Sequence, residues 1–264
     1  MLVSHESPIL GCTGMKRPPE RVHRDPAASG VANVDVGNVR EFFDTDAYLT
    51  RNPIVLIRAR LVAELLADLH GARVLDLGCG DGSVSLPLRV AGNDVTLVDF
   101  SEKMLRRAAQ AATSPAWGKA EYVQADVLDW EPEGVYEAVL CIGLLAHVSS
   151  PDRLLKRAAT ATRPGGHCIL QITDGGHPLG WLLSRYARIR QREGYRLNEL
   201  TRQKLVALAA RYGLMPLESR RYGLLLPGTG RLPYLWQLRL EDWVASSWLS
   251  HATAELLVVF EREN

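Results

Sequence analysis

The feature that most constrains this chain is a short apolar segment that runs directly into closely spaced glycines. Residues 74–82 read VLDLGCGDG, and Gly78, Gly80 and Gly82 allow positive φ angles and close approach of a ligand to the backbone. In a doubly wound α/β fold, ligands bind where the first strand meets the first helix. The loop lacks the GK[ST] of a P-loop, and Asp76 places a carboxylate where a phosphate would gain nothing. The segment therefore indicates a cofactor with a positive end and no pyrophosphate.

Strand-length apolar runs alternate with helix-length segments through most of the chain. Strands are expected at 73–77, 94–99, 120–125, 136–142 and 167–173, and helices at about 54–69, 83–91, 101–112 and 151–162. Beyond these, the pattern predicts helices at about 178–192, 201–212 and 234–248, and strands at 216–225 and 254–262. Strands separated by helices predict an α/β fold, with a doubly wound, mostly parallel sheet and helices on both faces.

The chain divides into a leader and one domain. Residues 1–32, rich in Pro, Gly, Ser and charge, are expected to form a disordered leader, and residues 33–264 a single domain. The less regular stretch at 174–200 is the natural place for a substrate-covering insertion. The leader lacks the pattern of a secretory signal, and no apolar run approaches the roughly 18 residues of a membrane span. A cytoplasmic location is therefore expected.

Composition and cysteine spacing narrow the class of protein. The 264 residues are 47% hydrophobic and 23% charged, which argues against wholesale disorder. None of the four cysteines has the spacing of a metal site, so no metal is expected. Cys79, Cys141 and Cys168 fall in strand or turn patterns, which indicates buried free thiols in a reducing compartment.

Acidic residues close the second and third expected strands. Asp99 lies 21 residues after the first glycine of the loop, where a carboxylate can accept hydrogen bonds from both hydroxyls of a ribose. Asp126 can hold an exocyclic amine of adenine, with the backbone N–H of Val127 beside it. Phe100 and Met104 then offer apolar contact to the purine.

The ordered segments VLDLGCGDG, VTLVDFSEKML, VQADVLDW, YEAVLCIGLLAHV and RPGG resemble the motif series of the class I S-adenosylmethionine-dependent methyltransferases. The similarity covers residues 48–173 strongly and the remainder only in layout. It implies a Rossmann-like sheet of seven strands with an antiparallel last strand, and S-adenosylmethionine as cofactor. Two departures stand out: Glu137 replaces the more usual Asp, and the [DN]PP[YFW] signature of many nucleic-acid methyltransferases is absent.

The resemblance also implies where the cofactor lies. The loop would lie under its methionine part, Asp99 on the ribose and Asp126 near the adenine. Arg51 is the candidate for the cofactor carboxylate, and Tyr48 for a lid over the sulfonium. The complete implied set is Tyr48, Arg51, Asp76, Gly78, Cys79, Gly80, Asp99, Phe100, Met104, Asp126, Val127 and Ile142.

These cofactor residues have ordinary alternatives. Asp76 can merely cap the turn that follows it, and Asp99 can be a solvent-exposed strand end. Arg51, at a helix start, can simply be solvated, and Asp126 is less firmly assigned than Asp99.

His147 is the leading candidate for a catalytic residue. It follows the fourth strand by one helical turn, and an ordinary imidazole pKa near 6.5 suits a general base. Asp174 and His177, just past the fifth strand, are candidates for binding or deprotonating the methyl acceptor. The alternatives are a packed structural His147 and a solvated His177. A base is not required in any case, because the sulfonium is already an activated donor.

Positive charge is concentrated in the second half of the chain. Residues 151–240 hold 16 Lys and Arg against 5 Asp and Glu. The arginines of segment 181–211 can form a solvated helix face, bind an acidic substrate, contact an anionic membrane or contact RNA. A solvated face is favoured for most of them, and a small acidic or amphipathic acceptor for one or two. Trp236, Trp243 and Trp248 are expected in the core.

Together these features predict a methyltransferase that moves a methyl group to an O, N or C nucleophile of a small molecule. The first alternative is an RNA methyltransferase that uses the basic segment 181–211. The second is a non-catalytic protein that binds the cofactor as a regulatory or assembly partner. The identity of the acceptor and the oligomeric state stay open.

Overall fold

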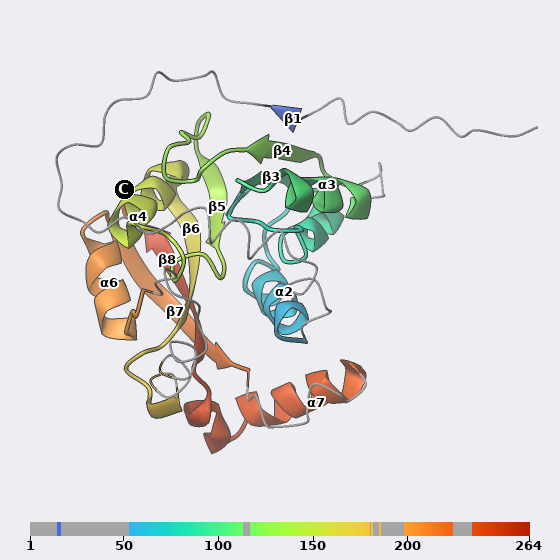
Figure 1. The fold of residues 1–264 in the computed structure, drawn as a ribbon. Coiled ribbons are helices and arrows are strands. Elements are labelled where there is room, and N and C mark those ends of the chain that lie inside the picture. The colour runs from blue at the N-terminus through green and yellow to red at the C-terminus, as the bar shows by residue number, and fades with distance from the viewer. Residues whose placement is uncertain are drawn as a thin grey trace, which may run out of the picture.

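A single mixed sheet organises the part of the chain that the computed structural model describes, residues 15–16, 53–112, 117–179, 181, 185, 198–223 and 234–264. Its strand order is β1-β4-β3-β2-β5-β6-β8-β7 (Figure 1). The strands are β1 Met15–Lys16, β2 Arg73–Leu77, β3 Asp94–Asp99, β4 Ala120–Gln124, β5 Tyr136–Cys141, β6 Thr162–Thr173, β7 Leu214–Tyr222 and β8 Glu255–Arg262. Neighbours from β1 to β6 pair in parallel, whereas β8 lies antiparallel between β6 and β7. The predicted doubly wound sheet of seven strands with an antiparallel last strand is confirmed, with the short β1 added at one edge.

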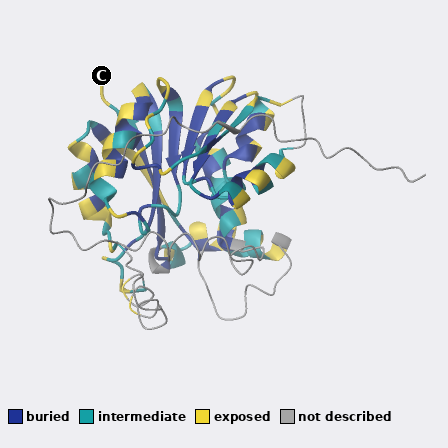
Figure 2. Ribbon diagram, turned by 45° about the horizontal axis from the view of Figure 1, so that its top comes forward, coloured by how far each residue is buried: buried dark blue, intermediate teal, exposed yellow. Residues whose placement is uncertain are grey.

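Helices cover both faces of the sheet, as the alternation predicts (Figures 1 and 2). They are α2 Pro53–Leu65, the 3₁₀ helix η2 Leu86–Ala91, α3 Glu102–Ala111, α4 Pro151–Ala161, α6 Arg202–Ala210, α7 Tyr234–Ala245 and the 3₁₀ helix η4 Trp248–Ala252. Residues of α2, η2 and α3 join one apolar cluster, and residues of α4 and α6 join another. The sheet separates these two halves of the core.

Each central strand supplies both clusters, because successive strand residues point to opposite faces. In β8, Leu256, Val258 and Phe260 belong to the cluster with α4 and α6, while Leu257 and Val259 belong to the other. Burial on both faces explains why these strands read as continuous apolar runs rather than alternating ones.

Hydroxyl side chains cap three of the described α-helices. Ser101, Ser150 and Thr201 accept hydrogen bonds from backbone N–H groups three residues further on, at 3.3, 3.3 and 3.2 Å. Ser101 confirms the predicted cap of α3. Since β3 ends two residues before this cap, the N-terminus of α3 lies at the carboxyl edge of the sheet.

Several elements differ from their predicted bounds by a few residues, and two differ in kind. The helix expected at 83–91 is only the short η2, because a turn in which Leu86 N–H bonds Gly82 O occupies its first residues. Strand β6 begins at Thr162, before the predicted RPGG turn. That segment forms an irregularity within the strand, with a register shift opposite Tyr136 and a positive φ of 67° at Gly165.

The prediction that Trp236, Trp243 and Trp248 lie in the core is wrong. They are 61%, 57% and 79% exposed. In α7 the side turned to the protein carries Leu238, Glu241 and Val244 instead, and the tryptophans lie outside it. Helical spacing places Trp236 and Trp243 on one face but does not say which face is buried.

The structure describes little of the two segments predicted as leader and insertion. Within 1–32, only Met15–Lys16 is described, and it pairs in parallel with β4. Within 174–200, the described residues are 174–179, 181, 185 and 198–200. Most of the helix expected at 178–192 therefore lies outside the described residues, as does Cys12. Cys79, Cys141 and Cys168 are buried free thiols, as predicted.

Candidate active site

The glycine loop forms the centre of the site. The N–H groups of Gly78 and Cys79 both donate to Val98 O, at 2.8 and 3.1 Å, which ties the loop to β3. Gly78 has a φ of 71°, and a Cβ there would lie 2.8 Å from the Leu144 side chain. Gly80 has a φ of 55°, and a Cβ there would meet nothing within 4 Å. The loop therefore requires glycine at both positions and leaves open space beside Gly80.

Asp99 lies where the sequence predicts, at the end of β3 and against the loop. Its Oδ2 accepts a hydrogen bond from Gly80 N–H and its Oδ1 from Ser101 N–H, both at 2.9 Å. These two bonds fix the plane of the carboxylate at the carboxyl edge of the sheet. A carboxylate held in this way is preorganised to accept further hydrogen bonds from a ligand.

Asp76 is buried beneath the loop, with only 2% of its surface exposed. Burial raises its pKa to about 7, and the negative charges of Asp99 and Asp81 add to that effect. A ligand that brings positive charge would stabilise the ionised carboxylate. The buried Asp76 carboxyl thus fits a cofactor with a cationic end.

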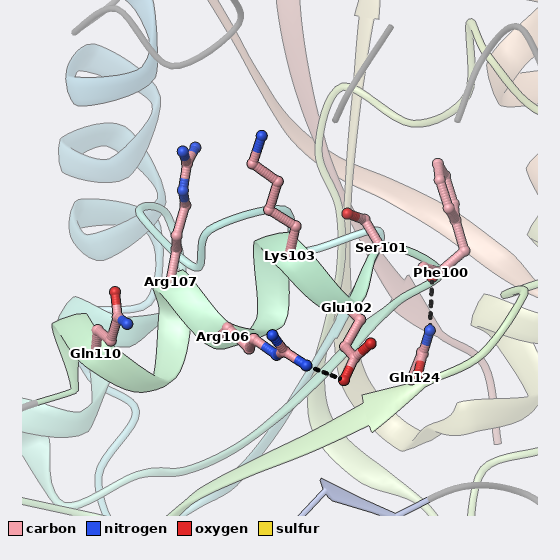
Figure 3. A pocket seen from close by; sticks show the side chains of 8 residues that line it. All are labelled: Phe100, Ser101, Glu102, Lys103, Arg106, Arg107, Gln110 and Gln124. Carbon is pink, nitrogen blue, oxygen red and sulfur yellow. Dashed lines mark hydrogen bonds and ion pairs between the residues drawn. The ribbon is translucent and has the colours of Figure 1, made fainter. Parts of the chain in front are cut away.

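The residues predicted to contact the purine are in different environments. Phe100 lines a hollow of about 490 Å³ along α3, together with Gln124, which donates to Phe100 O at 3.4 Å (Figure 3). Met104 is 1% exposed and Val127 6%, so both side chains are packed inside. Asp126 is exposed, and its Oδ1 accepts a hydrogen bond from Leu128 N–H at 2.8 Å. Phe100 and Asp126 are thus accessible to a ligand, whereas Met104 and Val127 could offer only backbone groups without rearrangement.

The loop after β5 packs against the glycine loop. It begins with the half-buried Ile142, and Leu144 packs over Gly78. His147 N–H donates to Leu144 O at 2.9 Å, which turns the chain back at this point. Burial lowers the pKa of the His147 imidazole to about 4, and the positive charge of Arg58 contributes. The imidazole is therefore neutral near pH 7 and a weaker base than an ordinary histidine.

Asp174 is committed to structural contacts. Its Oδ1 accepts hydrogen bonds from the N–H groups of Gly176 and Arg202, both at 3.1 Å, and its Oδ2 pairs with Arg221. Burial alone would raise the pKa of Asp174, but these donors lower it below its usual value. The carboxylate is thus a weak proton acceptor. His177 lies nearby, and its Nδ1 accepts a hydrogen bond from Leu179 N–H at 3.2 Å.

Sequence reasoning missed a group of buried polar side chains at the same edge of the sheet. Arg58 donates from Nε to the Tyr222 hydroxyl at 2.6 Å and from Nη2 to Glu255 at 2.9 Å. Gln171 and Thr173 also donate to Glu255. Two features of the sequence could have indicated this group. Arg58 places a charge on the apolar stripe of α2, and Glu255 places a carboxylate at the start of the apolar strand β8.

The remaining sequence predictions concern residues that the structure does not describe, the basic segment, metal sites and membrane helices. Tyr48 and Arg51 lie outside the described residues. Of the arginines in segment 181–211, those that the structure describes, Arg185, Arg202 and Arg211, are exposed, as a solvated face requires. Among the described residues, no group of three His, Cys, Asp or Glu is arranged to hold a metal ion. No described helix combines the length and apolar character needed to cross a membrane.

Comparison with curated proteins gives partial matches to one group of enzymes. The chain is 38% identical over 112 residues to a ubiquinone biosynthesis O-methyltransferase of Bordetella avium, covering 42% of this chain and 46% of that protein. The protein of the same description from Bordetella pertussis is 33% identical over 150 residues, covering 53% and 61%. The chain thus spans about half the length of the curated relatives that it matches.

Solved structures and a family match cover more of the chain. Magnesium protoporphyrin IX methyltransferase from Synechocystis PCC 6803, with bound S-adenosylhomocysteine (SAH), gives a TM-score of 0.62 at 21% identity, over 87% of this chain and 100% of that one. A 1,6-didemethyltoxoflavin-N1-methyltransferase from Burkholderia thailandensis gives a TM-score of 0.59 at 17% identity, and the match covers 90% of this chain and 94% of that one. At these identities the likeness shows a shared fold. Residues 51–219, more than half of the chain, match the family described as "Methyltransferase domain". The chain therefore belongs to this methyltransferase family, of the class I S-adenosylmethionine-dependent type that its motifs resemble.

Proposed function

We propose that this protein is an S-adenosylmethionine-dependent methyltransferase that acts on a small molecule. The observation that carries the proposal is the glycine loop, which has open space beside Gly80 and is bonded through Gly80 to Asp99. The buried Asp76 beneath it favours a ligand with a cationic end. When bound, S-adenosylmethionine supplies an electrophilic methyl group on its sulfonium.

In this proposal the residues of the chain bind and orient the two reactants. Asp76 neutralises the positive end of the cofactor, and Asp99 accepts hydrogen bonds from its ribose. Gly78, Cys79 and Gly80 lie under the methionine part. Positioning of this kind can accelerate a transfer from an activated donor without a catalytic base.

Further contacts at the adenosine and methyl ends complete the proposed cofactor site. Phe100 and Asp126 contact the adenine, with the backbone of Met104 and Val127 beside them, and Ile142 lines the methyl end. Tyr48 and Arg51 complete the site from the segment before α2.

The acceptor is proposed to lie between the loop after β5 and the segment 174–200. Asn198 supports this placement, because its Nδ2 donates to Leu145 O at 3.0 Å and to Val148 O at 2.6 Å. These bonds join Asn198 to residues that precede and follow His147 in the sequence. The described end of the segment, residues 198–200, thus begins beside the loop that carries His147. His147 accepts a hydrogen bond from the acceptor, and it acts as a base only for an acidic hydroxyl, since its pKa is about 4.

Labelled methyl transfer tests this function. The full chain is incubated with methyl-labelled S-adenosylmethionine and either a small-molecule extract or total RNA. Label in the small-molecule fraction is expected, and transfer should be lost in Asp99→Ala but kept in Asp94→Ala. Asp94 is a matched control because it opens the same strand and accepts a backbone hydrogen bond, from Lys119 N–H at 2.7 Å.

RNA is the second candidate acceptor, and one observation favours it. The exposed Arg185 lies over the Trp181 ring, 5.5 Å from its centroid, a basic and aromatic pairing that suits a nucleic-acid surface. Label in RNA, together with strongly salt-dependent RNA binding, would replace the small-molecule proposal. Binding of SAH with no transfer to either fraction would indicate a non-catalytic partner protein.

A cytoplasmic location is part of the proposal. Cys79, Cys141 and Cys168 are free and buried, which suits a reducing compartment. Fractionation of cells that express the tagged full chain tests the location.

A further inference from the structure

Four polar side chains from four different elements, three of them buried and one half-buried, meet at the carboxyl edge of the sheet. Arg58 comes from α2, Gln171 from β6, Tyr222 from β7 and Glu255 from β8. Glu255 is the common acceptor, receiving hydrogen bonds from Arg58, Gln171 and Thr173, with the Tyr222 hydroxyl 3.5 Å away. The carboxylate is therefore fully engaged, and its role is to hold the donors around it.

This cluster lies beside the loop after β5. A Cβ built on Gly143 would lie 3.5 Å from Arg58 Nη1 and 3.9 Å from Gln171 Oε1. The next residue, Leu144, packs over Gly78 of the glycine loop. The charge of Arg58 also acts on the imidazole of His147. The cluster thus adjoins the same loop that packs against the glycine loop and carries His147.

Two atoms of the cluster are not used in holding it together. Arg58 donates hydrogen bonds from Nε to Tyr222 and from Nη2 to Glu255. No group in the described part of the chain accepts a hydrogen bond from its Nη1. Gln171 donates from Nε2 to Glu255, which leaves its Oε1 directed toward Gly143. The absence of a side chain at position 143 leaves room between a cationic donor and a neutral acceptor.

The guanidinium is well suited to bind an anionic oxygen here. It is mostly buried, so an ionic hydrogen bond is weakly screened by solvent, and Tyr222 and Glu255 fix its plane. Its side chain is not fully enclosed, because 17% of its surface stays exposed. A guanidinium stays charged at every pH at which the protein is folded.

We propose that Arg58 and Gln171 form the acceptor subsite, which selects an acidic organic molecule. Nη1 of Arg58 binds a carboxylate or ionised hydroxyl of the acceptor, and Oε1 of Gln171 accepts a hydrogen bond from a neighbouring O–H or N–H. Tyr222 and Glu255 are positioning residues for Arg58. The proposal rests on the proposed function, because it places the acceptor of that reaction.

Benzoate and its neutral analogue benzamide are the probes for this subsite. Calorimetric titration of the full chain, saturated with SAH, should show benzoate binding at least tenfold more tightly than benzamide. Arg58→Gln should weaken benzoate binding at least tenfold while SAH still binds. Arg58→Lys, which keeps the charge but not the planar fork, should give a smaller loss.

A second variant avoids the risk that Arg58→Gln does not fold. Gly143→Ala fills the space beside Nη1 and leaves the bonds to Tyr222 and Glu255 in place, so benzoate binding should fall at least fivefold. Gly165→Ala is the matched control, because Gly165 has a similar φ of 67° and open space around it, away from this edge. It should leave benzoate binding unchanged.

The possible failures are separable. If SAH binds but benzoate does not, or binds no better than benzamide, the subsite proposal is overturned and the proposed function stands. Equal benzoate binding by Gly143→Ala and the unchanged chain would also overturn it. If SAH itself does not bind, the proposed function fails first.

Discussion

The two halves of the candidate active site are held together by different groups, one mainly by backbone and the other mainly by side chains. On the cofactor half, backbone N–H groups of Gly80 and Ser101 hold the Asp99 carboxylate, and the loop bonds to the backbone of β3. On the half proposed to bind the acceptor, long side chains such as Arg58 and Glu255 hold one another. A surface made of backbone is fixed by the fold and suits a constant ligand. A surface made of side chains can be changed by substitution, which suits a ligand that varies between relatives.

The largest expected effect is the loss of stability when the side-chain half is broken. Glu255→Ala leaves the mostly buried Arg58 without its counter-charge, which should lower the free energy of unfolding by about 3–5 kcal/mol. Asp242→Ala breaks the exposed Arg60–Asp242 pair and should cost at most about 1 kcal/mol. Urea unfolding of both variants measures the difference. Equal losses would show that the buried cluster does not hold this half together.

The next effect falls on the backbone half. Gly80→Arg introduces a side chain where φ is 55° and where the ligand is expected, and it should weaken SAH binding at least about 100-fold, or about 2.7 kcal/mol. Gly165→Arg imposes a similar backbone strain at a φ of 67° and should bind SAH normally. Calorimetry compares the two, and undiminished binding by Gly80→Arg would place the cofactor elsewhere.

Asp76 predicts how cofactor affinity depends on pH. In the ligand-free protein its pKa is raised to about 7, so below that pH the carboxyl is protonated and must lose a proton to stabilise a cationic ligand. Affinity for S-adenosylmethionine should therefore fall by up to about tenfold per pH unit below pH 7 and level off above it. Asp76→Asn should bind more weakly above pH 7, with no such slope. A flat profile for the unchanged chain between pH 5.5 and 8 would contradict this role of Asp76.

The smallest effect distinguishes two equivalent helix caps. Ser101→Ala and Ser150→Ala each remove a side-chain hydrogen bond at a helix start and should each cost about 1 kcal/mol of stability. Only Ser101 adjoins Asp99. We therefore expect a severalfold loss of SAH affinity in Ser101→Ala and none in Ser150→Ala. Thermal unfolding and calorimetry give the two readouts, and equal affinities would show that the α3 cap does not support the cofactor half.

Much of the fold, and the position of Asp99 at the end of β3 beside the glycine loop, could be predicted because the signals are local in sequence. Strands β2 and β3 have the bounds that their apolar runs predict. Gly80 and Asp99 are 19 residues apart, and parallel strands joined by one crossover bring their ends together. The pattern of one βα unit therefore carries this half of the site.

The acceptor half could not be predicted in the same way. Arg58 and Glu255 are 197 residues apart, and their contact depends on the antiparallel insertion of β8 between β6 and β7. No short pattern encodes such a pairing. The prediction that Trp236 and Trp243 lie in the core was wrong for a related reason. Helical spacing shows that two residues share a face, but not whether that face packs against the protein. Asp174, predicted from its position alone, turned out to have both oxygens held by structural donors.

Calorimetric titration of the full chain with SAH, alongside Asp99→Ala and Asp94→Ala, tests the central claim most directly. The claim is that the glycine loop and Asp99 together form the cofactor site. It predicts one-site binding by the unchanged chain, loss of that binding in Asp99→Ala, and unchanged binding in Asp94→Ala. Absence of saturable binding by the unchanged chain, or equal binding by all three proteins, would contradict it.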